Sequence, residues 1–234
     1  MAFNLRLCLA FLLLQPLSFS FAAAADKVPL ALYYETLCPY SSNFIVNYLA
    51  NIFKNGLLDI VDLKLVPYGN ARLRSNDSIS CQHGPYECLL NTVEACAINI
   101  WPDVHKHFSF IFCVESLVAE GKYTDWESCF QKTGLVSRLV ADCYTSGYGQ
   151  KLELRYAAET SALEPPHTYV PWVVVDGHPL YEDYEHFETY ICEAYKGPLP
   201  EACKAGVEQQ NKSQKNHALV SFLSSTSTRS ASSY

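Results

Sequence analysis

The sequence has little positive charge. It carries 17 Lys and Arg against 24 Asp and Glu, a formal net charge of -7 at pH 7. This balance leaves no basic surface for a nucleic-acid backbone, so we expect no nucleic-acid partner. After its first 25 residues the chain also lacks an apolar run of the roughly 20 residues that a membrane-spanning helix needs, so we expect no membrane span. No feature of the sequence sets the oligomeric state.

The start of the chain has the pattern of a secretory signal. Arg6 precedes the apolar stretch LCLAFLLL, and the small residues of FAAAAD offer a cleavage site near Ala24. Gln15 and Pro16 interrupt the apolar stretch, which is too short for a membrane anchor. The pattern therefore predicts a signal peptide at residues 1–25 and a secretory route for the rest of the chain.

Cysteine is abundant, and its number is informative. Of the ten cysteines, Cys8 lies within the predicted signal, which leaves nine. In an oxidising compartment most of these should be paired, and an odd number leaves one thiol free. Cys38 is the candidate for that thiol. The others are expected to form structural disulfides in an order that spacing does not decide: Cys81, Cys88, Cys96, Cys113, Cys129, Cys143, Cys192 and Cys203.

Two Asn-x-Ser sequons fit the same secretory route. Asn76 lies in the polar run RLRSNDSIS, and Asn211 lies in the polar segment that ends the chain. We expect both to be exposed and glycosylated. Residues 204–234 are expected to be a disordered tail because they are polar and rich in serine.

Residues 26–70 have the order of a strand, a helix and a second strand. VPLALYYETL is rich in strand-forming residues, and the apolar residues from Phe44 to Phe53 recur at helical spacing. Asn55 and Gly56 end this helix, and DIVDLKLV then alternates apolar and charged residues. Cys38 is placed at the junction between the first strand and the helix.

Residues 71–163 are predicted to be a helical insertion. Several short helical patterns follow one another, each closed by Gly or Pro, and six cysteines fall among them. One helix is expected to begin near Tyr86 and another at Asp103, a possible N-cap. His105 and His107 lie on adjoining faces of the second helix, and we expect both to be solvated.

Residues 164–203 return to strand character. TYVPWVVV and the next apolar run flank Asp176-Gly177, which is a strong hairpin signal, and YEHFETYICEAYKG follows as a closing helix. The full order predicts an α/β protein with a thioredoxin-like fold that is interrupted by a disulfide-rich helical insertion. In such a fold the Val170-Pro171 bond would be cis and would face the active cysteine with backbone atoms for the substrate.

The stretch CPYS carries the predicted chemistry. Cys38 would cap a helix that starts with Pro39, and a helix N-terminus favours the thiolate, which is the nucleophile in disulfide exchange. Ser41 stands where a dithiol site has its second cysteine. Its hydroxyl cannot attack a mixed disulfide, but it could donate a hydrogen bond to the Cys38 sulfur. Pro39 and Tyr40 would contact the substrate. The alternative is that Cys38 is simply one half of a structural disulfide.

Residues 81–96 are the most specific stretch of the chain. They match the pattern C-Q-H-G-x-x-E-C-x-x-N-x-x-x-x-C and so resemble the gamma-interferon-inducible lysosomal thiol reductase family. The matching residues are Cys81, Gln82, His83, Gly84, Glu87, Cys88, Asn91 and Cys96. The resemblance extends from about Val28 to Cys203. It implies a soluble reductase of protein disulfides in an acidic compartment, with Cys38 as the nucleophile. Family members usually carry a second cysteine at the position of Ser41.

Zinc is a weaker explanation for this stretch. The spacing of Cys81, His83 and Cys88 fits no usual zinc pattern, and we expect no metal. His83 could assist catalysis, but a structural or substrate-facing role in a loop is favoured.

The leading hypothesis is a thiol-disulfide oxidoreductase that acts on protein disulfides, extracellularly or in a lysosome or vacuole. It would need no cofactor, only an external small thiol. One alternative is a disulfide isomerase, because a single thiolate can rearrange disulfides. A second alternative is a secreted binding protein on the same scaffold with weakened activity. A third is a disulfide-rich helical lipid binder, which leaves both strand-rich ends unexplained.

Overall fold

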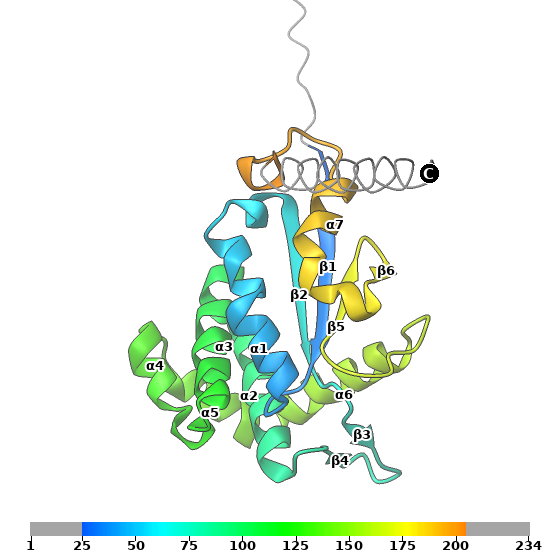
Figure 1. Cartoon of the computed structure of the whole chain (residues 1–234). Helices are drawn as coiled ribbons and strands as arrows, with labels where there is room; N and C mark the ends of the chain where they lie inside the picture. Colours follow the sequence, from blue (N-terminus) through cyan, green and yellow to red (C-terminus); the bar gives the residue numbers. More distant parts are fainter. Residues whose placement is uncertain (1–24, 205–234) are drawn as a thin grey trace, which may run out of the picture.

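The computed structural model describes residues 25–204 (Figure 1). Asn211, the predicted tail beyond Lys204 and nearly all of the predicted signal peptide lie outside the described residues. Among the helices of the described part, none is long and apolar enough to cross a membrane.

A four-stranded sheet in the order β2-β1-β5-β6 forms the centre of the fold. Its strands are β1 Val28–Tyr34, β2 Val61–Pro67, β5 Trp172–Val175 and β6 His178–Pro179. β1 pairs in parallel with β2 and antiparallel with β5, and β5 pairs antiparallel with β6. The predicted hairpin is confirmed, because Asp176 and Gly177 both have positive φ between β5 and β6, the conformation that a tight hairpin turn requires.

The two faces of the sheet are covered by different helices. Along β1, Leu30 and Leu32 point to one face, where they form a core with three helices. These helices are α1 Pro39–Asn47, α3 Val104–Ala119 and α7 Phe187–Ala194. Tyr33 points to the other face and packs with Trp172 and with Tyr156 from α6 Tyr148–Ser161. This alternation explains why both faces of β1 are largely apolar.

A second core lies among the helices of the middle segment. Besides α3 and α6, it is built from α2 Pro85–Ile100, α4 Ser128–Thr133 and α5 Ser137–Thr145. α3 takes part in both cores, because Phe108 and Ile111 pack on the sheet side while Phe110 and Val114 pack among the helices. The helical segment is thus fused to the sheet layer through α3, which lies beside α1 (Figure 1).

Short elements complete the chain. The 3-10 helices of residues 25–204 are η1 Leu49–Phe53, η2 Leu57–Ile60, η3 Tyr123–Asp125 and η4 Tyr181–His186. A small hairpin joins β3 Arg72–Leu73 to β4 Ile79–Ser80. We expected helical structure throughout residues 71–163, so the hairpin is a difference. Strands of two residues are too short for an alternating pattern to mark them.

Four disulfides connect the elements of the described part of the chain. Their pairs are Cys81–Cys88, Cys96–Cys143, Cys113–Cys129 and Cys192–Cys203. The second joins α2 to α5, and the third joins α3 to α4. The first joins the end of the small hairpin to the first turn of α2. Within residues 25–204, Cys38 is the one cysteine with a free thiol.

The expectation for His107 is wrong. His105 is exposed, and Asp103 caps α3 by accepting a hydrogen bond from the His105 amide. His107, however, is buried, and its Nδ1 lies 2.8 Å from the carbonyl oxygen of Trp101. Burial lowers the pKa of His107. A helix that packs between two cores has little free surface, and helical spacing alone did not reveal the second core.

A candidate thiol-disulfide exchange site at the start of α1

Cys38 lies between the end of β1 and the first residue of α1. It is the N-cap of that helix, with an extended backbone, and Pro39 takes the first helical position. The Cys38 carbonyl accepts the first helical hydrogen bond, from the Ser42 amide at 3.0 Å. The side chain is 6% exposed. The sulfur therefore lies where the unpaired amides of a helix start stabilise negative charge.

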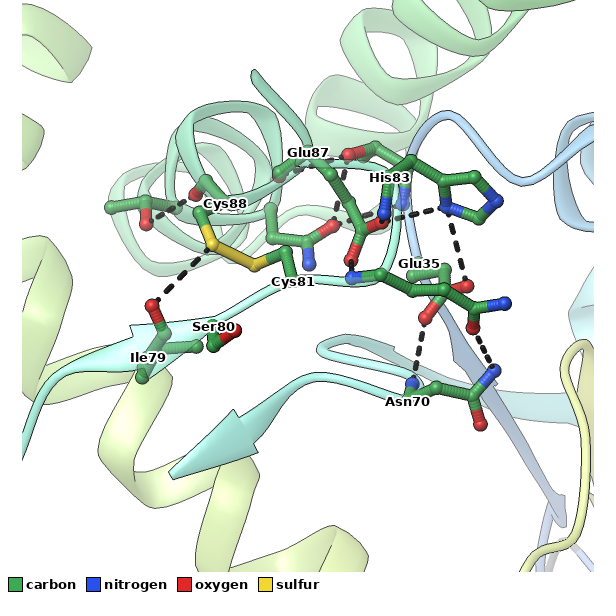
Figure 2. The surroundings of a disulfide bond; sticks show 12 residues. Glu35, Asn70, Ile79, Ser80, Cys81, His83, Glu87 and Cys88 are labelled. Carbon is green, nitrogen blue, oxygen red and sulfur yellow. Dashed lines mark hydrogen bonds and ion pairs between the residues drawn. A yellow bond between two sulfur atoms is a disulfide. The ribbon is translucent and has the colours of Figure 1, made fainter. Parts of the chain in front are cut away.

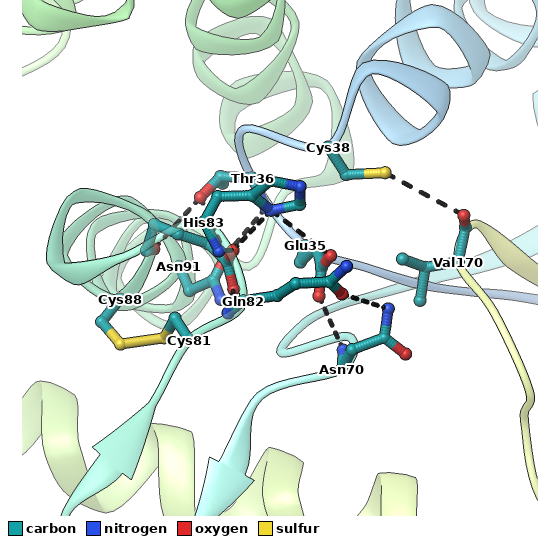
Figure 3. Close-up of polar contacts among 11 residues, drawn as sticks. Glu35, Thr36, Cys38, Asn70, Cys81, Gln82, His83, Cys88, Asn91 and Val170 are labelled. Atoms are coloured by element: carbon teal, nitrogen blue, oxygen red, sulfur yellow. Dashed lines mark hydrogen bonds and ion pairs between the residues drawn. A yellow bond between two sulfur atoms is a disulfide. The ribbon is translucent and has the colours of Figure 1, made fainter.

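Val170 and Pro171 lie opposite Cys38. The Val170-Pro171 peptide bond is cis, and the Val170 carbonyl oxygen lies 4.0 Å from the Cys38 sulfur (Figure 3). The fold thus brings together two segments that are 132 residues apart in the chain. Backbone atoms next to a nucleophile can align the backbone of a bound polypeptide.

The remaining residues of the CPYS stretch differ in exposure. Pro39 and Tyr40 are exposed, and Tyr40 keeps 67% of its surface, so both are accessible to a substrate. Ser41 is fully buried, and its Oγ has no hydrogen-bond partner among the described residues. The expected hydrogen bond from Ser41 to the Cys38 sulfur is therefore wrong. The sulfur points instead toward Val170, across the gap to the other segment (Figure 3).

The loop between β1 and Cys38 is fastened to α2. Asn91 Oδ1 accepts hydrogen bonds from both the amide and the hydroxyl of Thr36, each at 2.9 Å. The Thr36 hydroxyl also lies 3.1 Å from the Glu87 carbonyl oxygen. All three residues are fully buried. Leu37 then takes a positive φ of 64° before the chain reaches Cys38. Buried hydrogen bonds to α2 therefore fix the position of this loop.

His83 joins two buried carboxylates on the same side of the loop (Figure 2). Its Nδ1 lies 2.7 Å from Glu87 Oε2 and 3.5 Å from Glu35 Oε1. The Glu87 carboxylate also accepts the amides of Gln82 and His83, and Glu35 Oε2 accepts the amide of Asn70. Burial raises the pKa of Glu35. The sequence pattern marked His83 and Glu87, whereas nothing in it linked them to Glu35.

Glu35, His83 and Glu87 are also the residues that could hold a metal ion. Their ligand atoms lie within 4.8 Å of one another. In the described structure, however, the His83 Nδ1 directly faces Glu87 Oε2 at hydrogen-bonding distance, and each carboxylate accepts backbone amides. The cluster is therefore complete as a hydrogen-bond network, and no step of the chemistry below uses a metal.

A second group of buried acids lies deeper, between β1, α2 and α3. The Tyr34 hydroxyl donates a 2.5 Å hydrogen bond to Glu94 Oε2, whereas Glu94 Oε1 and both carboxyl oxygens of Glu115 are buried without a hydrogen-bond partner among the described residues. Burial raises the pKa of Glu94 to about 8. Burial, and then the charges of Glu94 and Cys38, raise the pKa of Glu115. Sequence reasoning missed these acids. The available signal was a lone Glu inside each apolar stretch, VEACA and CVESLV.

A cavity opens between the small hairpin and the segment that leads to Pro171. It has a volume of about 810 Å³ and is lined by residues 70–72, 80–82 and 167–168. Its walls are the small hairpin and the segment that leads to Pro171. Burial lowers the pKa of His167 in its wall. The cavity is open to solvent, so an extended chain bound near Val170 can continue into it.

The fold is shared with solved structures of bacterial oxidoreductases. The chain resembles BdbD from Bacillus subtilis with a TM-score of 0.52 and 13% identity, over 73% of this chain and 88% of the other. It resembles DsbA from Chlamydia trachomatis with a TM-score of 0.53 and 14% identity, over 73% and 88% of the two chains. These similarities confirm the predicted thioredoxin-like fold with its large helical part.

Sequence similarity is much closer to one group of proteins. The profile of the family "Gamma interferon inducible lysosomal thiol reductase (GILT)" matches residues 29–133. The chain is 43% identical to a gamma-interferon-responsive lysosomal thiol protein of Arabidopsis thaliana, over 85% of this chain and 84% of that one. It is 34% identical to the gamma-interferon-inducible lysosomal thiol reductase of Mus musculus, over 80% and 76% of the two chains. The chain therefore belongs to the gamma-interferon-inducible lysosomal thiol reductase family.

Proposed function

We propose that the chain is a thiol-disulfide oxidoreductase that reduces protein disulfides through Cys38 as a single nucleophilic thiol. The observation that carries this proposal is the placement of Cys38. It is the one free thiol of the described chain, it caps α1, and it lies 4.0 Å from the Val170 carbonyl oxygen beside a cis proline. Family membership points to the same class of reaction.

The chemistry begins with attack of the Cys38 thiolate on a sulfur of the substrate disulfide. One substrate sulfur leaves as a thiol, and the other stays bound to Cys38 as a mixed disulfide. In a dithiol site a second cysteine would now attack Cys38. Ser41 has no sulfur, so release of the substrate needs an external small thiol. Two such thiols are oxidised to one disulfide for each substrate disulfide that is reduced.

Substrate contacts follow from exposure and geometry. We assign the backbone of Val170 and Pro171 to the substrate main chain, because the carbonyl faces the reacting sulfur. Pro39 and the exposed ring of Tyr40 would border the same site. The preferred substrate is an unfolded or loosely folded polypeptide, since Cys38 is 6% exposed and a disulfide inside a rigid surface could not reach it.

The working compartment is part of the proposal. Four disulfides in the described residues need an oxidising route for their formation. Relatives are named lysosomal. We place the protein in the secretory pathway, with a lysosome or vacuole as the favoured destination and secretion as the alternative.

Reduction of a denatured, disulfide-bonded protein at pH 5 tests the function. The rate should rise steeply with added small thiol, and Cys38→Ala should abolish it. A mixed disulfide on Cys38, seen by mass spectrometry when the small thiol is left out, would identify the intermediate. Equal activity of Cys38→Ala and the unaltered chain would overturn the proposal. Rearrangement of scrambled disulfides without net reduction would favour the isomerase instead.

A further inference from the structure

Two carboxylates hold the His83 ring through its Nδ1 edge. Nδ1 faces Glu87 Oε2 at 2.7 Å and Glu35 Oε1 at 3.5 Å. The two carboxylates are almost fully buried, at 0% and 1% side-chain exposure. Glu87 Oε2 also accepts the His83 amide, so it acts as an acceptor, and the ring nitrogen that faces it, Nδ1, is the one that donates to it. Nε2 is then the nitrogen that can take up or give up a proton.

The other edge of the ring lies toward Cys38. In Figure 3 the imidazole stands beside the loop that ends at Cys38, with its Nε2 edge on the side of the cysteine. The His83 side chain is 32% exposed, so this edge is open to a bound substrate. Among the described residues, the charged groups paired with the ring are Glu35 from the loop and Glu87 from α2, and Figure 3 shows Cys38 on the side of its other edge.

We propose that His83 is the proton donor to the leaving thiol when Cys38 attacks a disulfide, with Glu87 and Glu35 holding its ring in place. This inference rests on the proposed function, because it assigns a role within the same reaction. It gives the Glu87–His83 pair a task that the fold alone does not require.

The step balances as follows. The Cys38 thiolate forms a bond to one substrate sulfur as the substrate S–S bond breaks. The bonding electron pair moves to the second sulfur. That sulfur takes the proton from Nε2 of the protonated His83 and leaves as a neutral thiol. His83 regains a proton from solvent. An external thiolate later attacks the Cys38 sulfur of the mixed disulfide, and the departing substrate sulfur is protonated by the same route while Cys38 stays bonded to the small thiol. A second external thiolate then attacks the sulfur of that small thiol, which gives the oxidised small disulfide and returns Cys38 as the thiolate.

A proton donor matters most for poor leaving groups. A thiol of low acidity leaves slowly as the thiolate, and a more acidic thiol leaves faster. General acid catalysis removes part of this difference and contributes on the order of 100-fold or more. Cysteine residues of polypeptides are poor leaving groups of this kind, with an ordinary pKa of about 8.5. Aromatic thiols with electron-withdrawing groups are far more acidic and need no donor.

The leaving group therefore supplies the test. Single-turnover formation of the Cys38 mixed disulfide is measured at pH 5 with an alkyl disulfide, bis(2-hydroxyethyl) disulfide, and with a nitrobenzoate disulfide. The key variant is His83→Asn. Its amide can donate to Glu87 from the position of Nδ1, so the loop contact is kept while Nε2 is lost. His186→Asn is the matched control, since His186 Nδ1 pairs with Asp183 at 2.6 Å on an exposed surface.

We expect His83→Asn to slow the reaction with the alkyl disulfide about 100-fold and to leave the nitrobenzoate reaction within about threefold. His186→Asn should leave both unchanged. Equal slowing of both reactions, or of neither, would overturn the proposal, because a purely structural role cannot depend on the leaving group. If His83→Asn lowers the melting temperature, His83→Gln is used with the same criterion. Failure of the unaltered chain to form a mixed disulfide with either reagent would instead reject the proposed function.

Discussion

Asn91 Oδ1 accepts two hydrogen bonds from Thr36, one from its backbone amide and one from its hydroxyl, although the two residues are 55 positions apart. Thr36 lies two residues before Cys38, so this buried contact sets the path of the loop that presents the sulfur. His83 and Glu87 act on the same loop through Glu35. The conspicuous segment of residues 81–96 thus serves as a clamp for the Cys38 loop.

Removal of this contact should weaken both the fold and the site. Asn91→Ala leaves the buried Thr36 amide without its partner, which costs about 1–3 kcal/mol of the free energy of unfolding. Alkylation of Cys38 by iodoacetamide should change in rate as the loop loosens. Asn99→Ala is the control on the same helix, because Asn99 is exposed; its effect should stay within about 0.5 kcal/mol. Equal urea midpoints for the two variants would contradict the clamp.

Local patterns were enough to predict the main elements. Cys38 and Pro39 at a helix start, the Asp176-Gly177 hairpin and the cis bond before Pro171 all agree with the structure. These features depend on neighbouring residues, or on the fold once it is recognised. The 81–96 pattern predicted the family in the same way, because several fixed positions fall within one short stretch.

The contacts around the site could not be predicted so easily. Glu35, Glu94 and Glu115 come from three separate elements, and only the packed fold brings them close to Cys38 or to one another. The burial of His107 likewise depends on a second core that periodicity does not show. The sequence also does not reveal which side chains form hydrogen bonds, since Ser41 lies one helical turn from Cys38 and yet does not donate a hydrogen bond to it.

A second cysteine should convert the site to a dithiol. Ser41 is buried and its hydroxyl has no partner among the described residues, so Ser41→Cys adds a thiol beside Cys38 without breaking a hydrogen bond. An intramolecular thiol has a high effective concentration, so reduction at low external thiol should rise at least tenfold, by the order of magnitude that such proximity gives. Ser109→Cys places a thiol on the exposed face of α3. If Ser109→Cys raises the rate as much as Ser41→Cys does, the gain does not come from a thiol next to Cys38, and the prediction is wrong.

The buried acids predict that stability falls as pH rises. The pKa of Glu94 is raised to about 8 in the folded state, against an ordinary value of about 4.3 in the unfolded chain. Between these values the folded state holds more protons than the unfolded state, so the free energy of unfolding decreases with pH. The raised pKa of Glu115 acts in the same direction. The chain should be most stable near pH 5 and should lose stability toward pH 8.

Thermal unfolding at pH 5, 6.5 and 8 checks this dependence. Each such carboxyl contributes a slope of up to about 1.4 kcal/mol per pH unit. Glu115→Gln is close in size to Glu115 but cannot ionise, so it should flatten the curve. Glu127→Gln, at an exposed position, should leave the curve unchanged. A melting temperature that rises from pH 5 to pH 8 would show that these acids are not protonated in the folded state.

Asn76 is expected to carry a glycan. It lies exposed at the turn of the small hairpin, and its Oδ1 accepts a 2.6 Å hydrogen bond from Ser78, the third residue of the sequon. Protein secreted from eukaryotic cells should lose the mass of one glycan in both Asn76→Gln and Ser78→Ala. Ser80→Ala, outside the sequon, should keep it. If the first two variants have the same mass as the unaltered chain, apart from the substitution itself, Asn76 carries no glycan and the prediction is wrong.

We expect two of the disulfides to differ in what they support, one mainly the stability of the fold and the other mainly the rate of the reaction. In the chain-entropy relation, closing a loop with a separation of 7 residues, as between Cys81 and Cys88, contributes about 2.5 kcal/mol. A separation of 47 residues, as between Cys96 and Cys143, contributes about 4 kcal/mol. The shorter loop nevertheless contains His83, so its removal releases the residue that faces Cys38.

Paired serine replacements test this difference. Cys81→Ser with Cys88→Ser should cost less stability in urea unfolding but should slow mixed-disulfide formation with an alkyl disulfide by about tenfold or more, since the proton donor contributes about 100-fold when ordered. Cys96→Ser with Cys143→Ser should cost more stability and, below the unfolding transition, should keep most of the rate. The reverse ranking of the two rates would mean that the loop position of His83 is set by its carboxylate partners alone. In that case the Cys81–Cys88 disulfide would serve stability and not the reaction.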